Sequence, residues 1–267
     1  MNKKIKRTDS AIRKSPYNKF TRVVKKLFGV DHRDYFNSAI IVAAGTGSRM
    51  NLPDGQTKQM LEIESVPVIV RTVLQFEACE DIDEIILVIR REEFDAYKGY
   101  YRKFNFKKVT HIVAGGETRQ RSVLNGLTRV NKDADFVTIH DGVRCLITPE
   151  MISEVCTFAY HYGAATAVSR PFDTLKLTED GSFIKETVDR DKIYHAQTPQ
   201  IFKFDMYRAA ALSAKKDGFE ATDDNSLVER MKFKIYMCDL GRENIKITTK
   251  EDIFVAEAIL KRRKEDV

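Results

Sequence analysis

The sequence of 267 residues contains no tryptophan, four cysteines and only six prolines. The cysteines form no C-x-x-C pair and show no spacing typical of a disulfide framework, which favours reduced thiols. No apolar run reaches the length of a membrane span, and the N-terminus lacks the apolar core of a secretory signal peptide. These absences argue against a disulfide-stapled secreted domain and against helical membrane spans, and they indicate a cytoplasmic location.

Excess positive charge is also absent from most of the chain. Residues 1–37 hold eleven Lys and Arg against three Asp, a balance of +8, whereas the remaining residues hold 34 basic and 36 acidic side chains, a balance of −2. The net charge of +6 therefore originates in the first 37 residues. Because a nucleic-acid-binding domain carries its basic residues on the folded body, we expect no nucleic acid partner.

Residues 1–37 are predicted to form a basic N-terminal extension that is partly disordered. Apolar residues recur at helical spacing between Phe20 and Phe28, with basic residues among them, which predicts a short amphipathic helix. This helix could pack against the protein's own body, contact a partner or an anionic surface, or belong to a cleaved targeting segment.

From Ser38 to about residue 263, short apolar segments rich in β-branched residues alternate with amphipathic helical patterns. Strands are expected at 39–44, 84–89, 108–113, 135–140, 164–169 and 233–238. Helices are expected at 67–79, 91–104, 118–127, 148–162, 204–216, near 222–230 and from 250 onward. This alternation is typical of βαβ units. The sequence therefore predicts one α/β domain over 38–263, with a doubly wound, mostly parallel sheet.

Residues 174–188 break this rhythm. They form two alternating segments around Glu179-Asp180-Gly181-Ser182, a tetrapeptide typical of a turn. We expect a protruding β-hairpin arm here, which could serve association or could simply be the edge of a sheet.

The first predicted strand runs into Ala43-Ala44-Gly45-Thr46-Gly47, followed by Arg49 and Lys58. Met50 stands where the dinucleotide-binding fingerprint requires a third glycine, and no Gly-Lys-Ser/Thr follows as in a P-loop. Small residues nevertheless let a ligand approach the backbone closely, and the two cations could together grip a polyphosphate.

Other candidate residues fall at the carboxyl ends of later predicted strands, which is where open parallel sheets bind ligands. Gly115 and Gly116 follow the third strand, Asp141 and Gly142 follow the fourth, and Thr174 lies shortly after the fifth. We expect these ends to gather at one edge of the sheet. Asp141 alone could equally cap a turn.

Seven segments in order from about Ser38 to Leu260 resemble the 2-C-methyl-D-erythritol 4-phosphate cytidylyltransferases. They are AAGTGSRM…TKQML, GGETRQRSVLNGL, IHDGVR, PFDTLK, VDRDKIYHAQTPQIF, ATDDNSLVE and GRENIKITTKEDI. The resemblance implies a fold of nucleotidyltransferase type. It implies transfer of CMP from CTP to 2-C-methyl-D-erythritol 4-phosphate, which gives 4-diphosphocytidyl-2-C-methyl-D-erythritol and pyrophosphate for isoprenoid precursor synthesis.

The resemblance also implies roles for particular residues. Arg49 and Lys58 would be the two transition-state cations, and Arg190 and Lys246 would position the acceptor phosphate. Thr174 would line the acceptor pocket. The nucleotide would be held by Ala43, Ala44, Gly45, Gly115, Gly116, Ser122, Asp141 and Gly142.

Two further implications concern the metal and the assembly. Asp141 would meet Mg²⁺, or another divalent cation, together with the triphosphate. The arm at 174–188 would reach a second subunit, giving a homodimer.

The sequence departs from the common pattern of the family at three positions. Thr57 stands where proline usually precedes the Lys-Gln pair, and Gly142 and Cys145 replace the more common residues after His140-Asp141. We expect the side chain of His140 to face the sheet interior, where it is no base, and Cys145 to be no nucleophile.

Purely structural roles for some of these residues, and two rival functions for the protein, stay open. Arg190 could pair with a neighbouring aspartate at the surface, and Lys246 could be a solvated lysine. One rival function is a cytidylyltransferase for another polyol phosphate, such as ribitol 5-phosphate. The other is a non-catalytic binding module whose basic tail docks on RNA or membrane.

Overall fold

The computed structural model describes residues 35–45, 47, 50 and 57–266. Arg49 and the amphipathic helix expected between Phe20 and Phe28 lie outside the described residues, as do residues 51–56. The predictions made for them therefore stay predictions.

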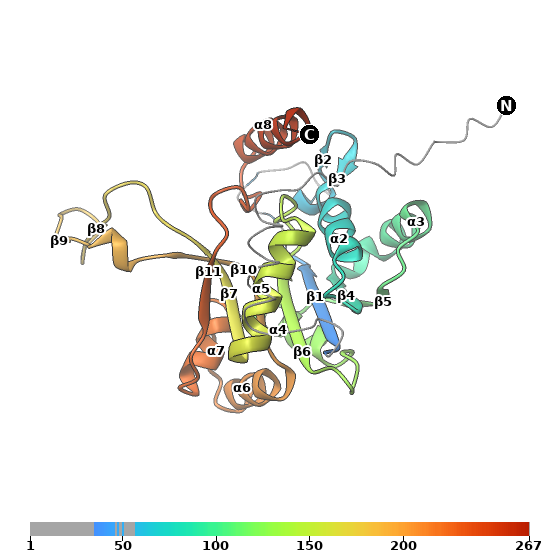
Figure 1. The fold of residues 1–267 in the computed structure, drawn as a ribbon, viewed down its shortest axis with the longest axis horizontal. Coiled ribbons are helices and arrows are strands. Elements are labelled where there is room, and N and C mark those ends of the chain that lie inside the picture. Colours follow the sequence, from blue (N-terminus) through green and yellow to red (C-terminus); the bar gives the residue numbers. More distant parts are fainter. Residues whose placement is uncertain (1–34, 46, 48–49, 51–56, 267) are drawn as a thin grey trace.

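A seven-stranded sheet lies at the centre of the described chain, with strand order β11-β7-β10-β6-β1-β4-β5 (Figure 1). Its strands are β1 (Asn37–Ala43), β4 (Glu84–Ile89), β5 (Val109–Ala114), β6 (Phe136–Asp141), β7 (Ala164–Ser169), β10 (His195–Lys203) and β11 (Tyr236–Asp239). β1 pairs in parallel with β4 and β6, β4 with β5, and β11 with β7, whereas β10 is antiparallel to both of its neighbours. The predicted mostly parallel α/β fold is confirmed.

Helices cover both faces of the sheet. One hydrophobic cluster joins the sheet to α2 (Val68–Ala78), α3 (Phe94–Phe104) and α5 (Pro149–Tyr162). The other joins it to α4 (Arg119–Leu127), α6 (Phe204–Lys216) and α7 (Asp224–Arg230). Because strand side chains alternate between faces, Ala39 and Ile41 belong to the first cluster and Ile40 belongs to the second. This burial on both sides is why the parallel strands read as continuous apolar runs.

Strand β10 was not expected from the sequence. It contains Gln197, Thr198 and Gln200, three polar residues that are buried, together with Pro199. The amide oxygen of Gln200 accepts hydrogen bonds from the backbone N–H groups of Asp224 and Asn225, so this buried polar atom has hydrogen-bond partners inside the protein. A strand with polar residues satisfied in this way shows no apolar alternation for sequence analysis to detect.

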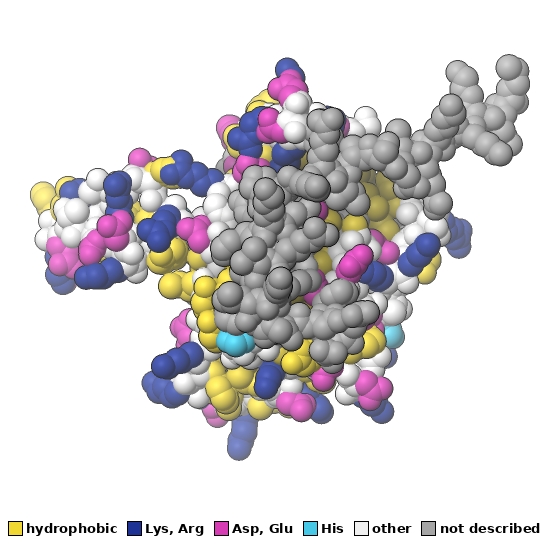
Figure 2. Space-filling model, in the orientation of Figure 1, with side chains coloured by type: hydrophobic (Ala, Val, Ile, Leu, Met, Phe, Trp, Pro, Cys, Tyr) yellow, Lys and Arg dark blue, Asp and Glu magenta, His cyan; other side chains and the backbone are white. Residues whose placement is uncertain are grey.

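The hairpin of β8 (Lys176–Leu177) and β9 (Glu186–Thr187) extends away from the central sheet (Figure 1). Its turn uses the predicted residues: Asp180 accepts hydrogen bonds from the N–H groups of Ser182 and Phe183, and Gly181 adopts a positive φ of 78°. The arm displays side chains of both charges as well as hydrophobic ones (Figure 2). Phe183 is 78% exposed and Ile184 is 66% exposed, which is unusual for residues of this kind.

The C-terminal helix α8 (Glu251–Glu265) forms a third cluster with the short hairpin of β2 (Glu62–Ile63) and β3 (Val66–Pro67). Ile63 and Ile247 are fully buried there, and the Arg263 guanidinium donates to the carbonyl oxygen of Leu146 at 2.8 Å. This cluster fixes the segment that leads from β11 to α8, and Lys246 lies in that segment. Within the described ranges, no helix is both long and apolar enough to cross a membrane.

Candidate functional site

A cavity of about 440 Å³ opens at the carboxyl ends of β1 and β6 and beside the first turn of α4. It brings together residues that are far apart in the sequence. Eight of the predicted site residues line it: Ala43, Ala44, Gly45, Lys58, Gly116, Ser122, Asp141 and Lys246. Gln59, Glu117, Thr118 and Arg119 also line it, although the sequence analysis gave them no role.

Glycine is required at both positions after β5 because neighbouring atoms approach the backbone there too closely to leave room for a side chain. A Cβ atom on Gly115 would lie 2.2 Å from the Cβ of Ala44, and one on Gly116 would lie 2.6 Å from the Cβ of Arg121. The N–H of Gly116 donates to Ser122 Oγ at 3.0 Å, which fixes the loop on the first turn of α4. Gly116 lines the cavity, and Gly115, which is not among the lining residues, directly precedes it.

Gly142 lies where neighbouring elements pack closely, and its predicted contact with a nucleotide stays a prediction. A Cβ there would meet Ile69 at 2.7 Å and Ala43 at 2.9 Å, and its carbonyl oxygen accepts from Thr72. The residue is not among those that line the cavity. It serves close packing between β1, α2 and the turn after β6.

Asp141 is the electrostatic centre of the cavity. Its Oδ1 accepts from Arg119 Nε at 3.1 Å, its Oδ2 accepts from Lys246 Nζ at 2.8 Å, and Arg144 Nε lies 3.6 Å from Oδ2. Burial by itself would raise the pKa of this carboxyl group, but Arg119, Lys246 and Arg144 together hold the pKa well below its ordinary value. The carboxylate is therefore ionised across the physiological range.

Arg119 links this carboxylate to a second one. Its Nη1 donates to Asp224 Oδ2 at 2.7 Å, and Asp224 also accepts from the buried Tyr207 hydroxyl at 2.5 Å. Thus α4, α6 and α7 meet through one ionic cluster. Arg119 and Asp224 occur in the quoted segments GGETRQRSVLNGL and ATDDNSLVE, but no spacing in a sequence reveals that two residues 105 positions apart form an ion pair.

Lys58 begins the short 3₁₀ helix η3 (Lys58–Met60) and is largely buried in the cavity wall. Its neighbour Gln59 donates from Nε2 to the carbonyl oxygens of Ala43 at 2.8 Å and Gly45 at 3.1 Å. The end of β1 and the lysine turn are thereby fixed to each other. Gly47 has a φ of 71°, and a Cβ there would lie 3.2 Å from Lys58 Cγ.

A second, basic hollow of about 320 Å³ adjoins the first, and Lys246 lines both. Arg144, Arg170, Arg242 and His195 contribute to it. None of these four was assigned a role from the sequence. Four cationic side chains together with His195, around a space of this size, suit a small phosphorylated molecule.

Thr174 and Arg190 lie at the arm and do not line the cavity that holds Lys58 and Asp141. Arg190, in the 3₁₀ helix η5 (Arg190–Lys192), donates to the carbonyl oxygen of Phe172 at 2.8 Å and so ties the two legs of the arm together. Asp189 is paired with Lys192 instead.

His140 and Cys145 match their expected passive roles. His140 is fully buried, and desolvation lowers its pKa to about 3. Thr198 Oγ1 accepts from the N–H of Asp141 at 3.0 Å and lies 3.1 Å from His140 Nδ1, so the Thr198 hydroxyl donates to a neutral ring. Burial raises the pKa of Cys145 to about 11, which leaves almost no thiolate at neutral pH.

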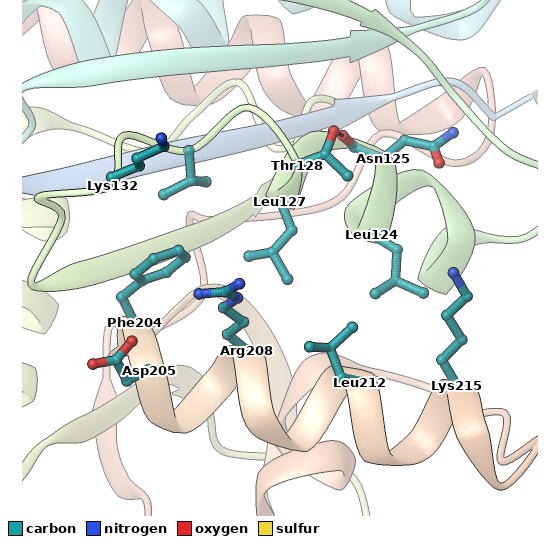
Figure 3. A pocket seen from close by; sticks show the side chains of 11 residues that line it. Leu124, Asn125, Leu127, Thr128, Lys132, Phe204, Asp205, Arg208, Leu212 and Lys215 are labelled. Atoms are coloured by element: carbon teal, nitrogen blue, oxygen red, sulfur yellow. Dashed lines mark hydrogen bonds between the residues drawn. The ribbon is translucent and has the colours of Figure 1, made fainter.

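A larger cavity, of about 620 Å³, lies elsewhere, between α4 and α6 (Figure 3). Arg208 rises from α6 toward Leu127 of α4, and Leu212 faces Leu124. Its walls combine aliphatic side chains with polar and charged ones, and none of the predicted site residues lines it. The smaller cavity at the strand ends, where glycines, cations and a carboxylate converge, is therefore the candidate site.

A sequence model of the 2-C-methyl-D-erythritol 4-phosphate cytidylyltransferases matches residues 38–262. The chain belongs to this family. A cytidylyltransferase of this name from Clostridium acetobutylicum is 40% identical over 227 residues, which is 85% of this chain and 98% of the relative. One from Caldanaerobacter subterraneus is 42% identical over 226 residues, covering 84% of this chain and 99% of the relative.

Solved structures of the cytidylyltransferase family share the fold. The crystal structure of 4-diphosphocytidyl-2C-methyl-D-erythritol synthase from Anaerococcus prevotii matches with a TM-score of 0.75 and 32% identity. The match covers 86% of this chain and all of that one. The rival of a non-catalytic binding module is therefore not supported.

We predict that the His140 ring stays neutral in the folded protein at pH 5, with the proton on Nε2, which lies 3.3 Å from the Arg144 carbonyl oxygen. Its folded pKa of about 3 lies below the value of about 6.5 in the unfolded chain, so only the unfolded state takes up a proton as the pH falls. The free energy of unfolding should therefore drop by roughly 1.4 kcal/mol per pH unit below about pH 6.5 through this group.

Long-range ¹H–¹⁵N spectra of the ring nitrogens check the protonation state, and urea titrations from pH 7.5 to 5 check the stability. A His140 ring that titrates near pH 6.5 in the folded protein contradicts the prediction.

Proposed function

We propose that the protein transfers CMP from CTP to 2-C-methyl-D-erythritol 4-phosphate, forming 4-diphosphocytidyl-2-C-methyl-D-erythritol and pyrophosphate. One observation carries the proposal: a glycine-lined cavity at the strand ends holds Lys58, Arg119 and Lys246 around the ionised Asp141. Family membership and the adjoining basic hollow support it.

The chemistry explains why cations are needed and a protein nucleophile is not. A phosphate oxygen of the acceptor, already ionised at neutral pH, attacks the α-phosphorus of CTP, and the bond to the pyrophosphate leaving group breaks. The obstacle is bringing a dianion to a polyanion and stabilising the charge on the α-phosphoryl oxygens. Lys58, and Arg49 from the sequence resemblance, would supply that stabilisation, while His140 and Cys145 take no part.

The two adjoining hollows divide the substrates in this proposal. The nucleotide would bind against Ala43, Ala44, Gly45, Gly116 and Ser122, where small residues permit close backbone approach. The acceptor phosphate would lie in the basic hollow, near Arg144 and Lys246. Lys246 lines both hollows, so it would stand between the two reacting groups.

A divalent cation fits this cavity. Mg²⁺ is commonly held by one or two carboxylates together with substrate phosphates, and Asp141 and Glu117 both line the space. Among the described residues, no cluster of three or more acidic, His or Cys side chains could hold a metal without substrate. We therefore propose that Asp141 holds Mg²⁺ only together with the triphosphate, where the ion would neutralise phosphate charge.

We also propose a cytoplasmic location. All four cysteines are buried free thiols, which suits a reducing compartment.

The activity is tested by pyrophosphate release from the four nucleoside triphosphates, each with 2-C-methyl-D-erythritol 4-phosphate, ribitol 5-phosphate or no acceptor. We expect CTP with methylerythritol phosphate to be used well ahead of every other pair, because backbone groups near Ala43 and Gly115 can read the 4-amino edge of cytosine. Comparable specificity constants for CTP and UTP would contradict the proposed transfer of CMP from CTP. Faster turnover of ribitol 5-phosphate than of methylerythritol phosphate would instead support the rival function, a cytidylyltransferase for ribitol 5-phosphate.

The roles of two cations can be separated by kinetics. Lys58→Ala should lower kcat roughly a hundredfold to a thousandfold with little change in CTP affinity, because its charge matters most as the transition state forms. Arg190→Ala should raise the acceptor KM and also lower kcat through misplacement, while CTP binding without acceptor survives. Lys261→Ala and Lys192→Ala, which alter exposed lysines on α8 and beside Arg190, are the matched controls. Near-normal kinetics for both test variants would show that neither Lys58 nor Arg190 serves the reaction.

We propose a homodimer joined through the arm. An isolated two-stranded hairpin is marginally stable in water, yet this one exposes Phe183, Ile184 and Leu177. Because Thr174 and Arg190 do not line the cavity of their own chain, the arm could deliver them to the acceptor site of the second subunit.

Sedimentation velocity should give a dimer at assay concentration. Phe183→Asp should shift it toward monomer and reduce turnover, whereas Phe254→Asp, on the exposed face of α8, should do neither. A fully active monomer of the unaltered protein would refute the dimer.

A further inference from the structure

The turn that carries Lys58 is too short to hold its own shape. The helix η3 has three residues, and its backbone bonds run from Met60 N–H to the Thr57 carbonyl at 3.0 Å and from Leu61 N–H to the Lys58 carbonyl at 3.4 Å. A single 3₁₀ turn fixes several dihedral angles for little hydrogen-bond energy. Thr57 also makes no capping bond to the N–H groups of this helix. Ties from outside must therefore position Lys58.

Two such ties flank the lysine. The Thr57 hydroxyl, almost completely buried, donates to Glu93 Oε1 at 2.5 Å. On the other side, Gln59 Nε2 donates to the carbonyl oxygens at the end of β1 and lies 3.5 Å from the same Glu93 oxygen. Lys58 is thus held between an anchor on Glu93 and an anchor on β1.

Glu93 is suited to this role by where it sits. It ends the 3₁₀ helix η4 (Arg91–Glu93), which directly follows β4, the strand paired with β1. Its Oε2 atom and the Tyr97 hydroxyl are both buried without a hydrogen-bond partner among the described residues. Burial raises the pKa of Tyr97 well above its ordinary value, and the nearby Glu93 charge adds a smaller effect in the same direction. In such surroundings a hydroxyl–carboxylate bond is shorter and stronger than a neutral one.

We propose that Glu93 is a positioning residue for the transfer reaction: through the Thr57 hydroxyl it fixes the turn from which Lys58 reaches the reacting phosphates. Glu93 is not among the residues that line the cavity, so it acts through Thr57 and touches no substrate. The inference rests on the proposed catalytic role of Lys58. In this proposal, the position of Lys58 in the transition state depends partly on Glu93, whose carboxylate lies 35 positions further along the chain.

The hydrogen bond predicts which substitutions matter. Glu93→Ala and Thr57→Val each remove one partner, and valine keeps the β-branched shape that suits the extended backbone of Thr57. Glu93→Gln keeps an oxygen that can accept from Thr57. Glu92→Ala is the matched control, because Glu92 is the adjacent residue and its side chain is 71% exposed.

Steady-state kinetics with CTP and acceptor should show kcat lowered roughly tenfold to a hundredfold in Glu93→Ala and Thr57→Val, since small misplacements of a reacting group have effects of that order. The CTP KM should change less than about threefold. Glu93→Gln and Glu92→Ala should stay within about threefold of the unaltered enzyme. The double variant Thr57→Val/Glu93→Ala should be no worse than the worse single variant, because both remove one interaction.

Hydrogen exchange gives a readout independent of turnover. The amide of Met60 should exchange faster in Glu93→Ala and Thr57→Val, while amides of β1 and β4 keep their protection. A fall in kcat together with faster exchange confined to residues 57–61 supports the proposal.

Three outcomes overturn it: unchanged kcat in both test variants, Glu93→Gln as impaired as Glu93→Ala, or loss of protection throughout the sheet. Failure of the proposed function is distinguishable, because the unaltered protein would then release no pyrophosphate from CTP and acceptor.

Discussion

The buried carboxylate of Asp141 is the group around which the site is organised. An ionised carboxylate without partners would be costly at this depth, so the fold must deliver cations to it. They come from three places: Arg119 from α4, Arg144 from the turn after β6, and Lys246 from the segment before α8. The pairs of Arg119 and Lys246 therefore also tie two separate parts of the chain to the end of β6. The ion pairs that assemble the site thus hold the fold together at this edge as well.

The same arrangement prepares the cavity for polyanions. Arg119 is shared between Asp141 and Asp224. The Asp224 carboxylate accepts a hydrogen bond from the Tyr207 hydroxyl, and the Asp224 backbone N–H donates to Gln200 Oε1. The cations are thus held by fixed partners before any substrate arrives, which is the preorganisation that electrostatic catalysis requires. His140, which is neutral, and Cys145, which is protonated, offer neither a charged ring nor a thiolate to the reaction. What the site can do is position phosphates and stabilise their charge.

Sequence analysis located the strands and helices well because the parallel strands are buried on both faces and the helices carry one apolar face. Strand β4 was expected at 84–89 and lies at Glu84–Ile89, and α4 was expected at 118–127 and lies at Arg119–Leu127. It missed β10, whose buried glutamines and threonine satisfy partners from other elements. It also could not foresee that Gly142 serves packing against Ile69, since a glycine looks alike in sequence whether a ligand or a side chain requires it.

The sequence by itself determined the fold class through its alternating pattern and the family through its resemblance in seven segments, and it pointed to eight of the residues that line the cavity at the strand ends. Only the tertiary structure decided which charges meet. Arg119 joins Asp141 and Asp224, Arg144 and Lys246 converge on one carboxylate, and Thr57 is anchored to Glu93. The physical reason is that an ion pair or a hydrogen bond depends on distances of about 3 Å, set by how the helices pack on the sheet. Spacing along the chain carries no information about those distances.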